Sequence, residues 1–343
     1  MNIGILLAVL SGVLFGICFT PMRYTKTLAW ENTWFTWNLV ACLVISPVIA
    51  WLTIPSVFEV FREIGLRLNL IMLGVGFVSG ASGIFFGLGL ARVGTTLVNS
   101  LCNGIGLIAG SFVPLMLQHR EAMKGQVGLW LAAGFVLSVA GVAVCAWAGS
   151  QRGESSEYMA HQSDPKARRR MVLQGILFSV LAGLITPLIN LGLAFGDDFM
   201  KVARAHGASE TFTSFAVYVP FFATTFLSNA IYCAYLWKKN HTQTQFKGPE
   251  RRPIVGISTL VAVLWIGANV LYGWALTQMQ TYGPILGWPI CLASCNIAAA
   301  ITECLYGDWK GRALATLSGG LALLTASIAA FGYICFLIQA PAA

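Results

Sequence analysis

The chain has 343 residues, of which 57% are hydrophobic and 10% are charged, and its formal net charge at pH 7 is +8. A soluble protein of this length could not cover its surface with so few charged residues, so the composition excludes a globular soluble protein. The basic residues lie between apolar runs and form no face that could track phosphates, so the charge does not indicate a nucleic-acid partner.

Clusters of charged residues separate nine uncharged runs that are rich in apolar residues. The runs cover residues 1–22, 32–58, 68–91, 93–119, 125–151, 171–196, 211–237, 253–302 and 313–343. A helix needs about 20 apolar residues to cross the roughly 30 Å hydrocarbon core, so most runs are one crossing long. The run 253–302 has 50 residues and must hold two crossings. We therefore predict an all-α polytopic membrane protein with ten transmembrane helices.

The break in the long run falls where polar and helix-breaking residues gather. Residues 278–284 read Gln-Met-Gln-Thr-Tyr-Gly-Pro, which combines amides and a hydroxyl with a glycine and a proline. Residues of these types end helices and favour turns. We therefore predict a tight hairpin between the eighth and ninth helices at this position.

A polar insertion after the fifth predicted helix divides the ten helices into two sets of five. An odd number of helices in each repeat makes the two repeats inverted in the membrane. The predicted units are the first five-helix repeat at 1–150, a basic cytoplasmic linker at 151–171 and the second five-helix repeat at 172–343.

Short motifs recur at corresponding positions of the two predicted repeats. A Thr-Pro pair closes the first helix at Thr20-Pro21, and another closes the sixth at Thr186-Pro187. The fourth and ninth helices carry the most helix-breaking residues, namely Gly104, Gly106, Gly110 and Pro114, and Gly283, Pro284, Gly287 and Pro289. Matched broken helices are typical of the substrate site of a secondary transporter, whereas close helix packing through small residues is the alternative interpretation.

Lys and Arg are unevenly distributed between the predicted loops. The loops after the first, third, fifth, seventh and ninth helices carry 15 of them, and the other four loops carry 6. Basic residues accumulate on the cytoplasmic side of a membrane protein. The distribution therefore predicts that both termini are periplasmic.

The sequence resembles the L-rhamnose-proton symporter family of the drug/metabolite transporter superfamily. The resemblance is most specific in Pro21–Trp34, which contains Trp30-Glu31-x-x-Trp34, in Gly87–Pro114, in Ser228–Cys233 and in Tyr272-Gly273-Trp274. It implies two five-helix halves and uptake of a deoxyhexose with a proton across the bacterial inner membrane. The sequence departs from the family pattern at Gly287-Trp288-Pro289, so L-rhamnose and a similar sugar both stay open as substrates.

A sugar carrier needs amides and hydroxyls for the sugar hydroxyls and aromatic rings for its apolar faces. Seven asparagines lie at or inside the apolar runs, where an unpaired amide is costly, and they are Asn38, Asn99, Asn103, Asn190, Asn229, Asn269 and Asn296. A hydrogen bond between helices is the alternative role for each one. Asn99 and Asn103 share a helix face because they are four residues apart. We predict a substrate-binding set of Asn99, Asn103, Asn269, Tyr272 and Trp274.

Proton coupling needs a group that titrates during transport, and the chain offers few such groups within its apolar runs. Glu303, near the end of the ninth predicted helix, is the deepest carboxylate by sequence position. We predict it as the proton-coupling residue, and an ion pair with Lys310 or Arg312 is the alternative. The scarcity of carboxylates also favours a rival mode in which substrate exchanges without protons.

The sequence therefore predicts a secondary active transporter that imports a monosaccharide, L-rhamnose or a similar sugar, with protons by alternating access. A metabolite or drug exporter or exchanger of the same superfamily, and a non-transporting membrane receptor, are the alternatives. No nucleophile, base and orienting residue can be recognised together, so we predict that the chain is not an enzyme. No metal or cofactor site is predicted, because all four histidines lie outside the cores of the apolar runs.

Overall fold

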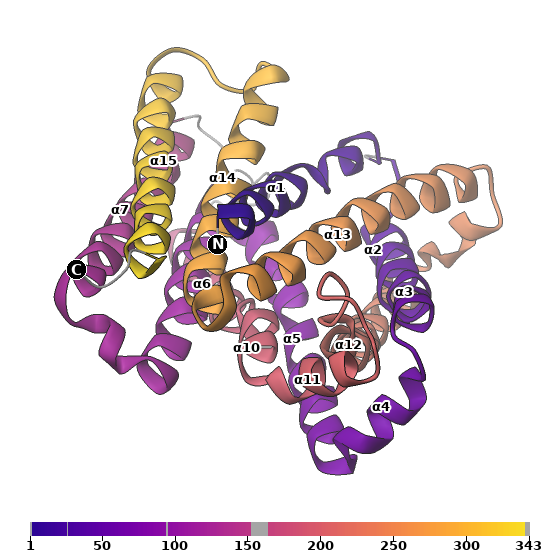
Figure 1. Ribbon diagram of the computed structural model, residues 1–343. Helices are drawn as coiled ribbons and strands as arrows, with labels where there is room; N and C mark the ends of the chain where they lie inside the picture. Colours follow the sequence, from indigo (N-terminus) through magenta and orange to yellow (C-terminus); the bar gives the residue numbers. More distant parts are fainter. Residues whose placement is uncertain (1, 26, 94, 152–163, 340–343) are drawn as a thin grey trace.

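The computed structural model describes residues 2–25, 27–93, 95–151 and 164–339, and within these ranges the chain forms helices and turns without strands (Figure 1). The α-helices are α1 Asn2–Ile17, α2 Trp30–Asn38, α3 Ser46–Thr53, α4 Val57–Ile64, α5 Leu66–Val93, α6 Thr95–Gln118, α7 Gly125–Ser150, α9 Pro165–Ile185, α10 Leu188–Phe195, α11 Asp197–Ala205, α12 Phe215–Asn240, α13 Arg251–Met279, α14 Trp288–Leu305 and α15 Gly311–Gln339. The 3-10 helices are η1 Thr20–Tyr24, η3 Arg120–Met123, η4 Thr242–Phe246 and η5 Gln280–Tyr282, and the π-helices are η2 Leu39–Ile45 and η6 Gly283–Gly287.

Within the described residues, nine segments are long and apolar enough to cross a bilayer. Eight of them have 18 to 30 residues, and the remaining segment, Arg251–Leu305, has 55. This long segment contains both α13 and α14, separated by η5 and η6. Gln280 ends α13 with a φ of 55° and a ψ of −137°, a backbone conformation outside the helical region. The predicted helical membrane class is confirmed, and the break at the predicted position is compatible with ten crossings.

The two Thr-Pro pairs have different effects on their helices. α1 ends at Ile17, and the 3-10 helix η1 begins at Thr20. α9 also ends before its Thr-Pro pair, at Ile185, but the chain then resumes as α10 within the same apolar segment. Proline lacks the N–H that continues a helix, so it interrupts the hydrogen-bond ladder without forcing the chain out of the membrane. The second pair therefore closes α9 as predicted, but it lies inside its membrane segment and not at the end of that segment.

The predicted basic linker falls largely on residues 152–163, which lie outside the described residues. Its C-terminal part belongs to a helix, because α9 already begins at Pro165. The carboxylate of Asp164 caps this helix by accepting a hydrogen bond of 3.0 Å from the backbone N–H of Lys166. The membrane segment that follows therefore starts with a basic helical turn.

Helices from the two predicted repeats pack against one another throughout the described molecule. α1 lies against α13 and α14, whereas α9 lies against α5 and α6. α5 also packs along α12, and α7 and α15 stand side by side at one edge (Figure 1). Each repeat thus supplies its first helix to the other repeat's third and fourth helices. The division into two inverted repeats itself stays a prediction.

Glycines allow α5 and α12 to approach closely. A Cβ atom placed on Gly76 would collide with the carbonyl oxygen of Phe221. A hydrogen bond also joins the two helices at this point, because Oγ1 of Thr225 donates to the carbonyl oxygen of Gly76 at 2.9 Å. Gly74, two residues earlier on α5, has no other atom within 4 Å of the same position. Small residues at this interface therefore set the distance between two membrane helices.

We expect Gly76→Ala to lower the free energy of unfolding by about 1–3 kcal/mol, because the added methyl group pushes two backbones apart. Gly74→Ala is the matched control on the same helix, and it should leave stability unchanged or raise it by about 0.5–1 kcal/mol. Thermal unfolding of the purified protein in detergent measures both. Equal effects of the two substitutions would contradict the close packing of α5 on α12.

Candidate functional site

The two most interrupted helices, α6 and α14, are joined by a pair of asparagine side chains. The Nδ2 of Asn103 on α6 donates a hydrogen bond of 2.8 Å to Oδ1 of Asn296 on α14. The Nδ2 of Asn296 in turn donates to the carbonyl oxygen of Leu292 within its own helix, at 2.9 Å. Both asparagines are half-buried. We call Asn103 and Asn296 the amide pair, since together they offer donors and acceptors between helices of the two predicted repeats.

A buried asparagine on α10 satisfies two backbone carbonyls that prolines have deprived of a donor. Asn190 is fully buried, and its Nδ2 donates to the carbonyl oxygens of Gly110, at 2.8 Å, and of Pro284, at 3.0 Å. The α-helical partner of Gly110 would be the N–H of residue 114, which is Pro114. In the π-helical register of η6, the partner of Pro284 would be residue 289, which is Pro289. One amide thus pairs carbonyls from α6 and η6.

Two aromatic residues complete this buried arrangement. The hydroxyl of Tyr272 on α13 donates a hydrogen bond of 2.5 Å to Oδ1 of Asn190. The Nε1 of Trp288 donates to the carbonyl oxygen of Gly106, at 2.9 Å, and its ring lies 5.8 Å from that of Tyr272. Gly110 leaves room for this indole, because a Cβ atom there would collide with Trp288. We call Asn190, Tyr272, Trp288 and the three carbonyls they bond the proline-carbonyl network.

Three of the five predicted substrate-binding residues lie in or beside these two groups. Asn103 belongs to the amide pair, and Tyr272 belongs to the proline-carbonyl network. Asn269 is fully buried one turn before Tyr272, and its Nδ2 donates to the carbonyl oxygen of Trp265 at 2.8 Å. The Oδ1 of Asn269 has no hydrogen-bond partner among the described residues.

The structure does not bring the other two predicted residues into these groups. Asn99 is exposed near the start of α6, although it shares a helix face with Asn103. Trp274 is half-buried and packs against a separate apolar cluster that contains Leu7 and Phe331. The spacing of residues along a helix predicts which face they share. It does not predict how deeply each side chain is buried, because burial depends on the neighbouring helices.

An aromatic cluster that the predicted set omitted lies between α2, α12 and the end of α1. The rings of Trp30 and Trp34 stack at 4.8 Å, and Phe19 stacks on Trp34 at 6.0 Å. The Nε1 of Trp34 donates to Oδ1 of Asn229 on α12, at 2.8 Å. The sequence signal for this cluster was the four-residue spacing of the two tryptophans, which places both rings on one helix face.

Glu31 is more deeply buried than its position at the edge of an apolar run indicated. Glu31 is only 4% exposed. Oε1 accepts hydrogen bonds from Nδ2 of Asn240, at 3.0 Å, and from Oγ1 of Thr242, at 2.5 Å. The end of α12 and the start of η4 fold over this carboxylate, so its burial depends on contacts more than 200 residues away in the chain.

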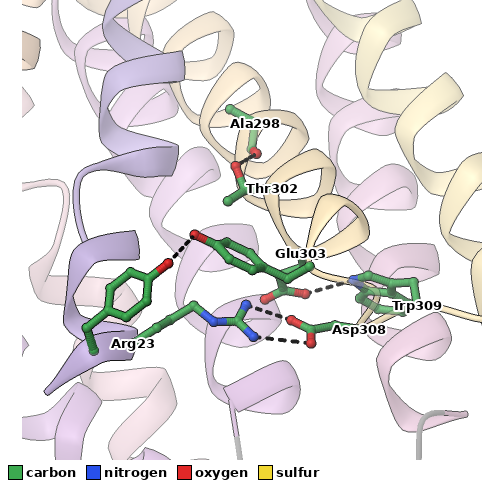
Figure 2. A network of polar contacts seen from close by, with 8 residues as sticks. Arg23, Ala298, Thr302, Glu303, Asp308 and Trp309 are labelled. Carbon is green, nitrogen blue, oxygen red and sulfur yellow. Dashed lines mark hydrogen bonds and ion pairs between the residues drawn. The ribbon is translucent and has the colours of Figure 1, made fainter. Parts of the chain in front are cut away.

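Glu303 lies at the end of α14 in a polar cluster with residues from η1 and the loop after α14 (Figure 2). Its Oε2 accepts a hydrogen bond of 2.8 Å from Nε1 of Trp309. Beside it, the guanidinium of Arg23 holds both carboxylate oxygens of Asp308, at 2.7 and 3.2 Å. Glu303 is seven residues after Asn296, so the two share a face of α14 about 10 Å apart along its axis.

The described residues contain no group of three or more His, Cys, Asp or Glu side chains that could hold a metal ion. The polar groups of the amide pair and the proline-carbonyl network are amides, an indole N–H, a phenol and backbone carbonyls. Such groups suit neutral hydroxylated molecules, because each hydroxyl both donates and accepts a hydrogen bond.

Comparison with known proteins agrees with this chemistry. The family model for the L-rhamnose-proton symport protein matches residues 1–335. The L-rhamnose-proton symporters of Yersinia pestis (strain Pestoides F) and Yersinia pseudotuberculosis serotype O:1b (strain IP 31758) are each 22% identical over 321 residues, covering 90% of this chain and 91% of theirs. A crystal structure of another protein matches 98% of this chain and 99% of its own, with a TM-score of 0.56 and 12% identity, and it supports the fold alone.

We expect Asn190→Ala to lower the free energy of unfolding by about 2 kcal/mol, because it leaves two carbonyls and the Tyr272 hydroxyl without partners. Asn38→Ala is the control, since Asn38 is also buried but donates only to Trp34 within its own run of helix. Its cost should stay below about 1 kcal/mol. Chemical or thermal unfolding in detergent compares the two. A cost for Asn190→Ala no larger than for Asn38→Ala would contradict the network.

Proposed function

Since this chain belongs to the L-rhamnose-proton symport protein family, we propose that it imports L-rhamnose or a similar monosaccharide together with protons by alternating access. The family consists of transporters and not of enzymes, and the apolar helices agree with a multi-pass membrane protein. The observation that carries the proposal is the family match, which extends over residues 1–335 and therefore over all the described helices except the last four residues of α15.

In our proposal the sugar binds at the amide pair. A sugar hydroxyl can replace the direct bond between Asn103 and Asn296, because each amide both donates and accepts. The unpartnered Oδ1 of Asn269 supplies a further acceptor, and Tyr272 fixes the adjoining network. Half-burial of the amide pair supports this position, since a site must exchange its contents with water on one side.

The proline-carbonyl network suits a barrier that opens and closes. Its bonds join α10, α13 and η6 to α6, and therefore join helices of both predicted repeats. A carbonyl that has lost its helical donor can exchange a side-chain amide for water without unwinding the helix further. We infer that Asn190 releases one or both carbonyls when the sugar site opens toward the side of the membrane on which the proline-carbonyl network lies.

Glu303 is the proposed proton site. It lies on the face of α14 that carries Asn296, so a change in its charge can act on the amide pair through one helix. The Trp309 N–H donates to the Glu303 carboxylate at 2.8 Å and fixes the position of that group. The positive-inside distribution supports a location of this cluster on the cytoplasmic side of the inner membrane, with both termini periplasmic.

An exchanger or exporter that moves its substrate without protons is the second candidate. Two buried or half-buried carboxylates, Glu31 and Glu303, lie in the apolar segments, and each already accepts hydrogen bonds from neutral donors. These bonds hold both carboxylates in place without a charged partner among the bonds named here, and this observation favours the second candidate. The family match favours proton coupling.

The proposed function predicts that L-rhamnose acidifies the interior of proteoliposomes that contain the purified protein. A pH-sensitive dye enclosed in the vesicles measures the change, and radiolabelled sugar measures uptake in parallel. Protein-free vesicles and a panel of other monosaccharides are the controls. Sugar uptake without acidification would indicate exchange or facilitated diffusion and contradict symport. The absence of both uptake and acidification for every sugar would contradict sugar import.

Asn103→Ala should raise the KM for the sugar about tenfold or more, because the hydroxyl at the amide pair loses one partner and Asn296 loses another. Asn99→Ala, one turn away on the same helix, should change KM less than about twofold, since Asn99 is exposed. Uptake of radiolabelled sugar gives both values. A similar increase in KM for the two variants would indicate that Asn99 also contacts the sugar, and it would contradict a site centred on the amide pair.

Glu303→Gln should abolish sugar-dependent acidification while downhill sugar exchange continues, because glutamine cannot gain or lose the proton. Glu121→Gln is the control, because Glu121 is an exposed carboxylate that contacts His119 outside the membrane segments. Glu31→Gln tests the other buried carboxylate. If Glu303→Gln keeps coupling and Glu31→Gln removes it, the proton site is Glu31.

A further inference from the structure

The first half of α9 carries basic and then apolar residues along one face. Lys166, Arg169, Arg170, Leu173, Gln174 and Leu177 line a groove of about 410 Å³. Their spacing of three and four residues places all six on the same side of the helix. The order along this side is three cations first, followed by leucines and one amide.

This face points away from the helix bundle. The opposite side of α9 is packed, since Ser179 and Ala182 are fully buried and a Cβ atom on Gly183 would lie 3.0 Å from the carbonyl oxygen of Cys102 on α6. On the groove side, Leu173 and Leu177 are 57% and 55% exposed. α9 begins the apolar segment Lys166–Phe195, so exposed leucines on it face the lipid.

The spacing of the cations and leucines matches the layers of a bilayer leaflet. Leu177 lies eight residues after Arg169, which is about 12 Å along the helix axis. This length reaches from the headgroup layer into the hydrocarbon core. Lys166, Arg169 and Arg170 are exposed, and none of them forms an ion pair with another described residue. Their charge is therefore available to an anion at the headgroup level.

We propose that this groove binds one phospholipid with an anionic headgroup. Arg169 and Arg170 bind the phosphate and Lys166 the remaining headgroup charge, whereas an acyl chain lies along Leu173 and Leu177. Arginine suits phosphate because its planar guanidinium donates two parallel hydrogen bonds. A free phosphate or a nucleic acid would leave the leucines uncovered, so the apolar half of the groove favours a lipid. The inference is independent of the transported substrate.

The test compares three neighbouring arginines that carry the same charge. Native mass spectrometry of the full-length protein titrated with phosphatidylglycerol gives the affinity for the first bound lipid. We expect Arg169→Gln and Arg170→Gln each to weaken this affinity about fivefold. Arg168→Gln removes the same charge outside the groove and should change the affinity less than about twofold. Equal losses for all three variants would indicate diffuse attraction and overturn the proposal.

Two further measurements separate a lipid from its headgroup alone. Leu177→Asp places a negative charge in the apolar half and should abolish the first binding step without loss of Arg169 or Arg170. Phosphatidylcholine should bind at least about tenfold more weakly than phosphatidylglycerol, because its headgroup has no net charge. Displacement of the lipid by an excess of inorganic phosphate, or unchanged binding by Leu177→Asp, would overturn a phospholipid as the occupant.

Discussion

Backbone carbonyls that lose their helical donor in the protein interior must find another one, and this constraint organises the contact between α6, α10 and η6. Bulk water does not reach a buried carbonyl, so such a group is costly when it has no hydrogen-bond partner. Pro114 and Pro289 each remove one donor, and the carbonyls concerned belong to α6 and η6. The side-chain amide of Asn190 donates a hydrogen bond to each of these two carbonyls. Asn190 thereby joins α10 to both α6 and η6.

Side-chain hydrogen bonds also join the two predicted repeats at α6. Asn190 and Trp288 of the second predicted repeat bond carbonyls of α6, and Asn103 on α6 bonds Asn296 on α14, so the position of α6 depends on contacts between the repeats. Side-chain hydrogen bonds can be exchanged one at a time, and this property suits a carrier whose two halves must move relative to each other.

The membrane class, the positions of the helices and the break near residue 280 could be predicted, because each depends on local features such as charge and helix-breaking residues. Tyr272 and Asn103 were also predicted, since amides and phenols in apolar runs need partners. Asn190 and Asn296 were recognised as buried amides but not chosen. Their partners lie 80 to 193 residues away in sequence, and no local pattern identifies them.

Asn99 shows the limit of arguments from helix faces. Its four-residue spacing from Asn103 fixed the direction of its side chain but not its depth, because depth is set by the helices that surround α6. Glu31 shows the converse, since a carboxylate at the edge of an apolar run becomes buried when the end of α12 folds over it. Tertiary contacts therefore decide which polar residues of a membrane protein form a site.

An experimental structure of the protein with L-rhamnose bound tests the central claim most directly. The account predicts the sugar between Asn103 and Asn296, with their direct hydrogen bond replaced by bonds to sugar hydroxyls. Sugar bound beside Asn99 or Trp274, with the amide pair still intact, would contradict it.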